Sequence, residues 1–366
     1  MSGQNTYSAA LLSATEPAPP PRSRRCGRCQ PHNLALLFAV AAASLSLTFT
    51  VIVLQETWHS EMFQTVRPTG PPARTDVIRG ANLGSWLVVE PWVTPSLFYP
   101  FLCDATKGCP EGKPPVIDMA SLCERLGPNA TGPYLKKHMD TWVTEATIAR
   151  LAAAGLNLLR VPYGFWIFGD SATVCPGLSH ISYLDDAVDW AEKHGIQLLL
   201  EIHGVANSAN GMDHSGVSHK PPWARAWGRD SWQGNAWISD PYVGVTRAAI
   251  KAVAERYAKR SHVVLMGLVN EVLMADFPQC DGGCAVSAAE LASYFESTWK
   301  EIGPLMPRNA SRGQPAVRPV LDAGLLTGLA TNADAWATEG PKMAANPTLK
   351  DGVVDFHMCA PRSRLT

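Results

Sequence analysis

The sequence predicts a parallel α/β barrel of the eight-stranded (βα)8, or TIM, type, of which about six βα units are present. Short apolar runs rich in β-forming residues alternate with longer stretches of helical spacing, which is typical of parallel strands joined by crossover helices. No run is joined to the next by a two-residue hairpin turn. The six runs are 77–83, 156–161, 196–203, 263–269, 317–322 and 353–357.

The helices between these runs carry recognisable boundary signals. Segment 145–154 has apolar residues at helical spacing and stops at Gly155, a common residue just past a helix end. The other signals are the capping-box pairs Ser182/Asp185 and Ser287/Glu290, a stop at Gly195, and Asp240 followed by Pro241. A doubly wound sheet would also alternate strands and helices, but it normally has a glycine-rich phosphate loop after its first strand. The first run continues as NLGSW, which leaves no room for that fingerprint.

The region before the barrel predicts a membrane anchor. Residues 1–32 are polar and proline-rich, with four arginines between positions 22 and 28, and we expect a disordered cytoplasmic tail. Segment 34–54 has no charged residue, and its 21 residues are long enough to cross a bilayer. The apolar region of a cleaved signal peptide is only about 7–15 residues long. We therefore predict a signal anchor at 33–55, a stalk at 56–75 and the partial barrel at 76–366.

Charge and cysteine usage agree with an exported domain. The arginines keep the N-terminal side in the cytoplasm, so we expect a single-pass type II protein of the plasma membrane with its barrel outside the cell. Seven of the nine cysteines follow the anchor, where disulfides form, and the close pairs are Cys103/Cys109 and Cys280/Cys284. The sequons at Asn129 and Asn309 are typical of a glycoprotein. The net charge of −1 argues against nucleic acid as a partner.

Specific polar residues stand at or just after the ends of the apolar runs. In a (βα)8 barrel the active site gathers at the carboxyl ends of the strands. These residues are Asn82 with Glu90 beyond it, Arg160, His203, Asn270 with Glu271, Asp322, and His357.

The chemistry that this pattern favours is glycoside hydrolysis, which needs a general acid and a second carboxylate. We expect Glu271 to be the acid, with a pKa raised by a partly apolar cleft. Asn270 beside it can hydrogen-bond a sugar hydroxyl, and Arg160 and His203 can fix the charge and orientation of the nucleophile.

Five sequence blocks resemble the exo-β-1,3-glucanases of glycoside hydrolase family 5, and they occur in the order of that family. The blocks are RGANLGSWL (79–87), AGLNLLRVPYGFW (154–166), EIHGVANSANGMDHSG (201–216), VNE (269–271) and VVDFHM (353–358). The resemblance implies a retaining hydrolase that releases glucose from the ends of β-1,3-glucan chains. Two carboxyl groups about 5 Å apart are then expected, and neither a cofactor nor a metal.

The resemblance also implies roles for individual residues. Glu271 matches the acid/base, Asn270 the asparagine before it, and Glu90 a carboxylate that contacts the terminal glucose. The remaining predicted substrate-binding residues are Arg160, His203 and His357, which line the sugar subsite, and Met212 and Asp213 in the block at the cleft entrance.

Three positions depart from the family pattern. Met212 stands where phenylalanine is usual, His214 where asparagine is common, and Cys359 where the sixth-strand motif carries tyrosine. The first two departures keep open a related enzyme for another linkage, such as β-1,6-glucan. His203, His214 and His219 lack the spacing of metal ligands and have no added carboxylate, so we expect no metal there.

The partner carboxylate is not found in the sequence. The family's nucleophile is a glutamate at the end of strand seven, in a Gly-Glu-Trp-like motif, and nothing after Glu271 matches it. We expect Asp322 and Asp355 to be structural. Six strands would leave a barrel open, with unpaired edges, so we predict a C-terminally truncated or mis-spliced glucanase. A monomeric, cooperatively folded protein would contradict that prediction. The alternative function is a non-catalytic, glucan-binding pseudoenzyme.

Overall fold

The computed structural model describes most of the predicted barrel region. The described residues are 77–103, 115–169, 174–175, 178–218, 236–257, 259–274, 286–306, 317–324 and 329–357, without the side chains of 329–335. The chain divides at residue 67 into two units, and all described residues lie in the second. The predicted tail, anchor and stalk lie outside them, so these and the localisation stay predictions. Within the described ranges, no helix is long and apolar enough to cross a membrane.

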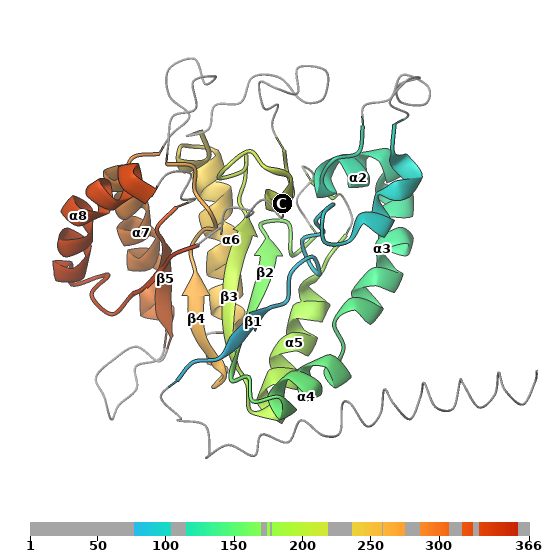
Figure 1. Ribbon diagram of the computed structural model, residues 1–366, viewed down its shortest axis with the longest axis horizontal. Coiled ribbons are helices and arrows are strands. Elements are labelled where there is room, and N and C mark those ends of the chain that lie inside the picture. Colours follow the sequence, from blue (N-terminus) through green and yellow to red (C-terminus); the bar gives the residue numbers. More distant parts are fainter. Residues whose placement is uncertain are drawn as a thin grey trace, which may run out of the picture. The chain divides into compact units, whose positions relative to one another are not determined.

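Six parallel strands form one sheet in the order β1-β2-β3-β4-β5-β6, so each strand pairs with the next one along the chain (Figure 1). This order confirms a sequentially wound half-barrel, because a doubly wound sheet reverses its strand order. The strands are β1 Gly80–Asn82, β2 Leu158–Gly164, β3 Gln197–Gly204, β4 Val263–Gly267, β5 Arg318–Asp322 and β6 Val353–Asp355. Each of the six predicted runs overlaps one of these strands. However, β2 continues to Gly164, so Arg160 lies within this strand and not near its end.

Several predicted helix boundaries are confirmed. Gly155 and Gly195 have the left-handed φ values of 88° and 70° that follow a helix end, and Ser287 forms the predicted capping box with Glu290. The capping box predicted at Ser182 and Asp185 is wrong, because the helix begins at Ile181 and its N-cap residue, His180, forms no side-chain cap. The α-helices are α2 Met119–Leu126, α3 Pro128–Trp142, α4 Glu145–Ala153, α5 Ile181–His194, α6 Tyr242–Tyr257, α7 Ala288–Ile302 and α8 Leu329–Ala345. The 3-10 helices are η1 Pro95–Leu97, η2 Tyr99–Phe101, η4 Asp213–Ser215, η6 Ala236–Ile238 and η7 Gly303–Leu305.

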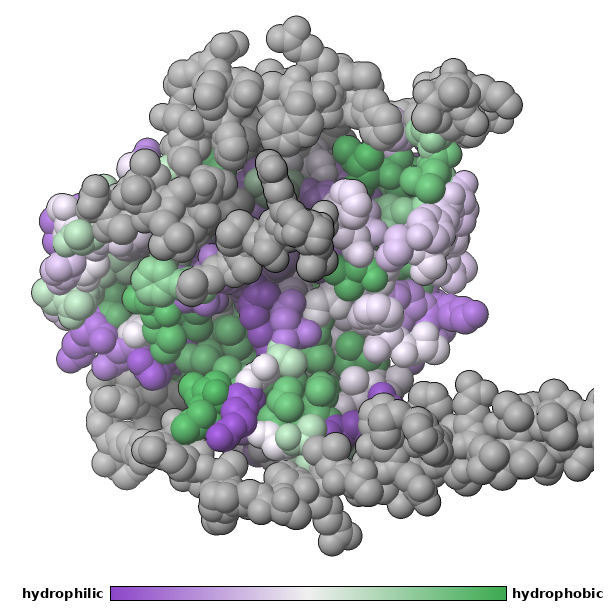
Figure 2. All heavy atoms as spheres, in the orientation of Figure 1, coloured by the Kyte–Doolittle hydropathy of each residue, from purple (hydrophilic) through white to green (hydrophobic). Residues whose placement is uncertain are grey.

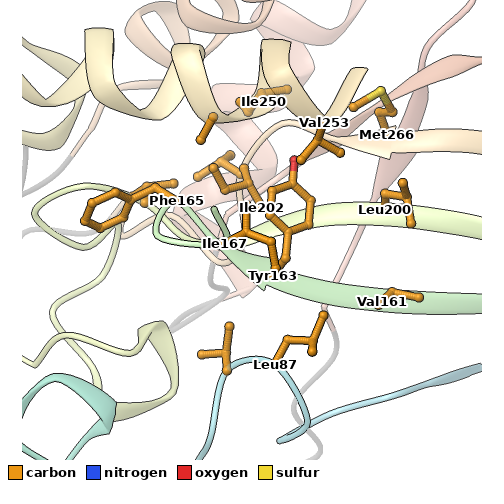
Figure 3. Packing of buried hydrophobic residues seen from close by; sticks show 14 of the residues in the cluster. Leu87, Val161, Tyr163, Phe165, Ile167, Leu200, Ile202, Ile250, Val253 and Met266 are labelled. Carbon is orange, nitrogen blue, oxygen red and sulfur yellow. The ribbon is translucent and has the colours of Figure 1, made fainter. Parts of the chain in front are cut away.

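The main hydrophobic core lies between the sheet and its helices. Figure 3 shows Ile250 and Val253 of α6 over Ile202 of β3 and Met266 of β4. All four side chains are essentially inaccessible to water. Because side chains alternate along a strand, each strand contributes every second residue to this core. The other residues of each strand face the opposite side of the sheet, which is the inner face of the half-barrel.

The inner face has an apolar layer and, nearer the carboxyl ends of the strands, a charged layer. Leu199, Leu265 and Val320 form the centre of the apolar layer. Leu158 of β2 and Val353 of β6 pack against them. Two residues further along β2, β3, β5 and β6, and therefore on the same face, come Arg160, Glu201, Asp322 and Asp355. In the orientation of Figure 1, Figure 2 shows green hydrophobic spheres around a purple hydrophilic patch near the centre of the view. The charged layer therefore supplies the polar side chains from which a site at this end of the sheet can be formed.

Gly267 makes room in the charged layer. A Cβ atom at this position would lie 2.5 Å from Cγ of Glu201 on the neighbouring strand, which no side chain tolerates. Glycine in a central strand normally weakens it, because it adds conformational entropy and no packing. Here the missing side chain lets the Glu201 carboxylate stand on the inner face.

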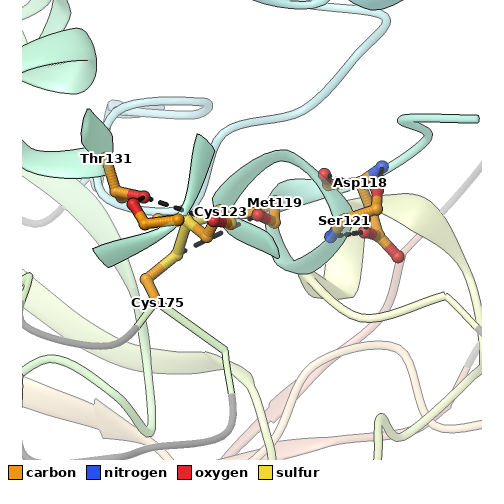
Figure 4. Close-up of a disulfide and its surroundings, with 7 residues drawn as sticks. Asp118, Met119, Ser121, Cys123, Thr131 and Cys175 are labelled. Atoms are coloured by element: carbon orange, nitrogen blue, oxygen red, sulfur yellow. Dashed lines mark hydrogen bonds between the residues drawn. A yellow bond between two sulfur atoms is a disulfide. The ribbon is translucent and has the colours of Figure 1, made fainter. Parts of the chain in front are cut away.

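A disulfide joins Cys123 of α2 to Cys175 in the segment that follows β2 (Figure 4). Both residues are buried. The sequence predicted disulfides in this region of the chain, but it did not identify this pair, whose members are 52 residues apart. The close pairs that it did suggest remain predictions, because Cys109, Cys280 and Cys284 lie outside the described residues.

Replacing Cys123 and Cys175 together by alanine should lower the free energy of unfolding. Because the bridge closes a loop of 52 residues, chain entropy sets the loss at up to about 4 kcal/mol. Urea unfolding followed by circular dichroism measures it. Treating the unmutated chain with a reducing agent should cost at least as much, because it also opens the disulfide of Cys103. An unchanged urea midpoint in the double variant would show that the Cys123–Cys175 bridge contributes nothing.

The sheet edges should promote self-association. In the described part of the chain, β1 and β6 each pair on one side only, and Val354 of β6 is 48% exposed. An exposed apolar edge strand recruits further strands. The Val354→Lys variant should therefore associate less with rising concentration, as measured by sedimentation velocity. Val245→Lys, on the exposed side of α6, is the matched control. Equal association of both variants and the unmutated chain would exclude β6 as the contact.

Candidate active site

Glu271 is held in an unusual backbone conformation just after β4. Its φ is 49°, in the left-handed region that non-glycine residues rarely adopt. Its backbone N–H donates a hydrogen bond of 2.9 Å to Oδ2 of Asp322, at the end of β5. Such conformations cost about 1–3 kcal/mol and persist where the surroundings enforce them, often at functional sites. The carboxylate is partly buried, with 18% of its side chain exposed.

Two histidines hold the Glu271 carboxylate. His357 Nδ1 lies 2.7 Å from Oε1, and His214 Nε2 lies 2.7 Å from Oε2. Burial acts to raise the pKa of Glu271, but the hydrogen bonds and charges of the two histidines outweigh it and hold the pKa well below its usual range. Our prediction of a raised pKa is therefore wrong. That prediction rests on the apolar cleft and does not include the two imidazoles. In the sequence, His214 is recognisable only as a departure from the family pattern.

His357 also faces two aspartates. Its Nε2 lies 3.3 Å from Oδ2 of Asp355 and 3.7 Å from Oδ2 of Asp322. The hydrogen bonds to Asp355 and Glu271 raise the pKa of His357 to about 10, so the imidazole is a cation at neutral pH. Burial raises the pKa of Asp322 to about 6. We expected both aspartates to be structural, but the structure places both against a residue of the predicted site.

A buried ion pair lies beside this group. Arg160 forms a short hydrogen bond to Oε1 of the buried Glu201, and His203 Nδ1 lies 3.1 Å from Oε2 of the same carboxylate. Burial raises the pKa of Glu201, whereas the Arg160 charge and the His203 hydrogen bond lower it, and the net shift is downward. We expected Arg160 and His203 to orient the nucleophile, but the carboxylate that both of them contact is Glu201. Sequence analysis missed this residue, although its place two residues before His203 puts both on one face of a strand.

Asn270, the residue before Glu271, has a side-chain donor without a partner in the described part of the chain. The residue is fully buried, and its Oδ1 accepts a hydrogen bond of 2.5 Å from Nη2 of Arg160. That bond fixes the orientation of the side-chain amide. The other end, Nδ2, has no hydrogen-bond partner among the described residues. Because a buried N–H without a partner is costly, this donor is suited to a ligand.

The remaining predicted residues surround His214. Burial acts to lower the pKa of His214, but its bond to Glu271 and the charges of Glu271, Asp213 and Glu90 raise it. Glu90 therefore lies near enough to act on the site, and its Oε1 accepts a hydrogen bond from Ser85 N. Met212 N bonds to the Asn210 side chain, and no described contact joins Met212 to Glu271.

A groove with a volume of about 490 Å³ opens beside Glu90. Asn82 and Gly84 line it together with Glu90, and its apolar wall includes Val93 and Trp142. A glycine at position 84 keeps the approach open, because a Cβ atom there would lie 3.0 Å from Asn82 Nδ2. The groove therefore has an apolar wall together with the polar side chains of Asn82 and Glu90, and Asn82 accepts a hydrogen bond from Arg160 of the charged layer.

Comparison with known proteins identifies relatives of this arrangement. Residues 126–303 match the family model described as cellulase (glycosyl hydrolase family 5). The chain is 32% identical over 249 residues to the probable glucan 1,3-beta-glucosidase A of Aspergillus niger, covering 68% of this chain and 51% of the relative. It is 38% identical over 195 residues to the glucan 1,3-beta-glucosidase of Blumeria graminis, covering 53% and 40%. The chain thus spans about half the length of these relatives.

Solved structures support the fold. The crystal structure of AoRut superposes with a TM-score of 0.55 at 20% identity, covering 78% of this chain and 69% of that one. The rutinosidase from Aspergillus niger gives a TM-score of 0.51 at 19% identity, covering 68% and 63%. At these identities the likeness concerns the fold alone. The family match over residues 126–303 and the similarity to these relatives support a glycosyl hydrolase family 5 domain that resembles the fungal glucan 1,3-beta-glucosidases.

Proposed function

We propose that the protein hydrolyses β-1,3-glucan from chain ends and releases glucose, with retention of configuration and with Glu271 as acid/base. The observation that carries this proposal is that Asn270, whose buried amide donor has no partner within the described ranges, directly precedes the Glu271 carboxylate. The carboxylate can transfer a proton to a glycosidic oxygen, and the amide can hold a hydroxyl of the same sugar. The relation to glucan 1,3-beta-glucosidases supports the choice of linkage.

Substrate binding in this proposal uses the pre-formed polar layer. The Glu201 carboxylate holds Arg160, and Arg160 holds Asn270 Oδ1, so the amide is oriented before the sugar arrives. Pre-organised donors are effective because no reorganisation is needed when the ligand binds. Glu90 and the groove beside it receive the terminal glucose, and the apolar wall covers the face of its ring.

Proton transfer must begin from an ionised Glu271. In the free site the carboxylate is an anion between two imidazoles, and an anion has no proton to give. A sugar that displaces His214 from Oε2 removes one of the interactions that lower the pKa. The proton on His357 Nδ1 then passes to Oε1 and on to the glycosidic oxygen as the bond from this oxygen to C1 breaks. In the second step water attacks C1 and displaces the second carboxylate, while its proton passes to the Glu271 carboxylate and from there back to His357 Nδ1.

The second carboxylate has no match in this sequence, because nothing after Glu271 resembles the family's Gly-Glu-Trp-like motif. It must attack C1 from about 5 Å away from the acid. Asp322 is occupied, because its two oxygens accept hydrogen bonds from the backbone N–H groups of Glu271 and Gly324. Asp355 is hydrogen-bonded to His357.

Two alternatives follow from specific observations. A glucan-binding protein without turnover is favoured by the low pKa of Glu271 and by the engagement of both nearby aspartates. A family 5 enzyme for another linkage, such as β-1,6-glucan, is favoured by His214, which contacts the acid directly. Both alternatives use the same sugar-binding residues, so the choice of substrate and the detection of product separate them.

The Glu271→Gln variant should lose glucose release from laminarin by about 10²–10⁴-fold, the usual contribution of a general acid/base. Laminarin binding, measured by isothermal titration calorimetry, should persist, because glutamine keeps the shape of the side chain. Glu255→Gln, on the exposed surface of α6, is the matched control. Binding by the unmutated chain without any glucose release would establish the non-catalytic alternative, and release from pustulan but not laminarin would establish the β-1,6 linkage.

The His357→Gln variant should change the pH dependence of stability. Because folding raises the pKa of His357 from 6.5 to about 10, its contribution is fully present below about pH 6.5 and is lost as the pH rises to about 10. The variant should be less stable than the unmutated chain at about pH 6 and should lose less stability between that pH and about pH 10. Urea unfolding at both pH values measures this. Parallel losses in the two proteins would contradict the assignment.

A further inference from the structure

We propose that Asp322, Asp355 and His357 form a binding site for a divalent transition-metal ion of the zinc class. The ligand atoms of the three side chains, one from each, lie within 4.8 Å of one another. They come from the ends of two neighbouring strands, where Asp322 and Asp355 are direct register partners.

The distances around His357 Nε2 are more suitable for a shared cation than for two hydrogen bonds. The Asp355 and Asp322 oxygens lie 3.3 and 3.7 Å from this nitrogen, whereas N–H···O bonds cluster at about 2.7–3.2 Å. A single N–H also cannot point at both oxygens. In a tetrahedral zinc site with ligand bonds of about 2.0–2.1 Å, neighbouring ligand atoms are about 3.4 Å apart. A modest contraction of the cluster would complete three corners of such a tetrahedron.

The surrounding hydrogen bonds orient these side chains as metal ligands. His357 Nδ1 lies 2.7 Å from the Glu271 carboxylate, so a neutral imidazole carries its proton on Nδ1 and leaves the lone pair of Nε2 free. Histidines that bind metals usually have such a carboxylate on their other nitrogen. The Asp322 carboxylate is fixed by hydrogen bonds from Gly324 N to Oδ1 and from Glu271 N to Oδ2. Because a carboxylate oxygen has more than one lone pair, Oδ2 keeps one for an ion on the side of His357.

The local charge also favours a cation. The carboxylates of Glu271, Asp322 and Asp355 lie 2.7, 3.7 and 3.3 Å from the ring nitrogens of His357. Three carboxylates around one imidazole leave negative charge that a bound cation would neutralise.

The ligand types and their exposure select the class of ion. One nitrogen and two carboxylate oxygens suit zinc, with water in the fourth position, whereas Mg²⁺ and Ca²⁺ prefer oxygen ligands only. Asp322 is nearly inaccessible, but 30% of Asp355 and 19% of His357 are exposed. Solvent can therefore reach the fourth position.

The test is isothermal titration of ZnCl2 into the full chain, without an affinity tag and in a Cys26→Ser/Cys29→Ser background. The background is needed because a C-x-x-C pair can itself bind zinc. We expect one ion per chain. Asp355→Asn and His357→Gln should each weaken binding at least tenfold, and Glu271→Gln, which alters the orienting carboxylate, by about 10–100-fold. Asp351→Asn, just before β6, should bind as the background protein does.

Circular dichroism first verifies that each variant is folded. Asp355 is the main target because it is partly exposed and lies on β6 at the edge of the described sheet, where a substitution disturbs the fold least. Absence of zinc binding by the background protein would overturn the proposal, as would equal affinities of the Asp355→Asn, His357→Gln and Asp351→Asn variants. Substituting Co²⁺ should give a visible absorption band that His357→Gln abolishes, and its persistence would also overturn the proposal. Zinc binding by a chain that releases no glucose would leave the metal site standing and refute the proposed hydrolysis alone.

Discussion

The buried pair between Arg160 and Glu201 is the interaction on which the inner face depends. Glu201 is nearly inaccessible to water, and a buried carboxylate is tolerated only when it is paired and hydrogen-bonded. Arg160 supplies the paired positive charge and also donates hydrogen bonds to Asn82 and Asn270. One guanidinium therefore connects β1, β2, β3 and the segment after β4. The glycine at position 267 is part of the same arrangement, because any side chain there would displace the carboxylate.

A second polar group follows from the first. With Asn270 fixed by Arg160, the next residue, Glu271, takes a left-handed backbone conformation whose N–H is held by Asp322. Its carboxylate then meets His214 from the loop after β3 and His357 from the segment after β6. The acid/base candidate thus depends on charges from three separate segments. This explains why its pKa falls although its surroundings are partly buried, and why its protonation would respond to anything that binds His214 or His357.

Much of the fold was predictable because it depends on local patterns. Alternating runs and helix stops at Gly155 and Gly195 follow from backbone preferences that act within a few residues. The strand-end positions of Asn270, Glu271 and His357 also followed from these runs. The role of Glu201 and the direction of the Glu271 pKa shift did not, because both depend on strand register and on contacts between residues far apart in sequence. The same is true of the Cys123–Cys175 bridge, whose members are separated by 52 residues.

The most direct test of the account is a crystal structure of the Glu271→Gln variant with a laminarin oligosaccharide. We expect a terminal glucose beside Glu90 and a sugar hydroxyl that accepts a hydrogen bond from Asn270 Nδ2. The glycosidic oxygen should lie within hydrogen-bonding distance of the side chain at position 271. We also expect His214 to have moved away from that side chain. An oligosaccharide bound elsewhere, with Asn270 Nδ2 still unpartnered, would contradict the central claim that this polar layer is the sugar site.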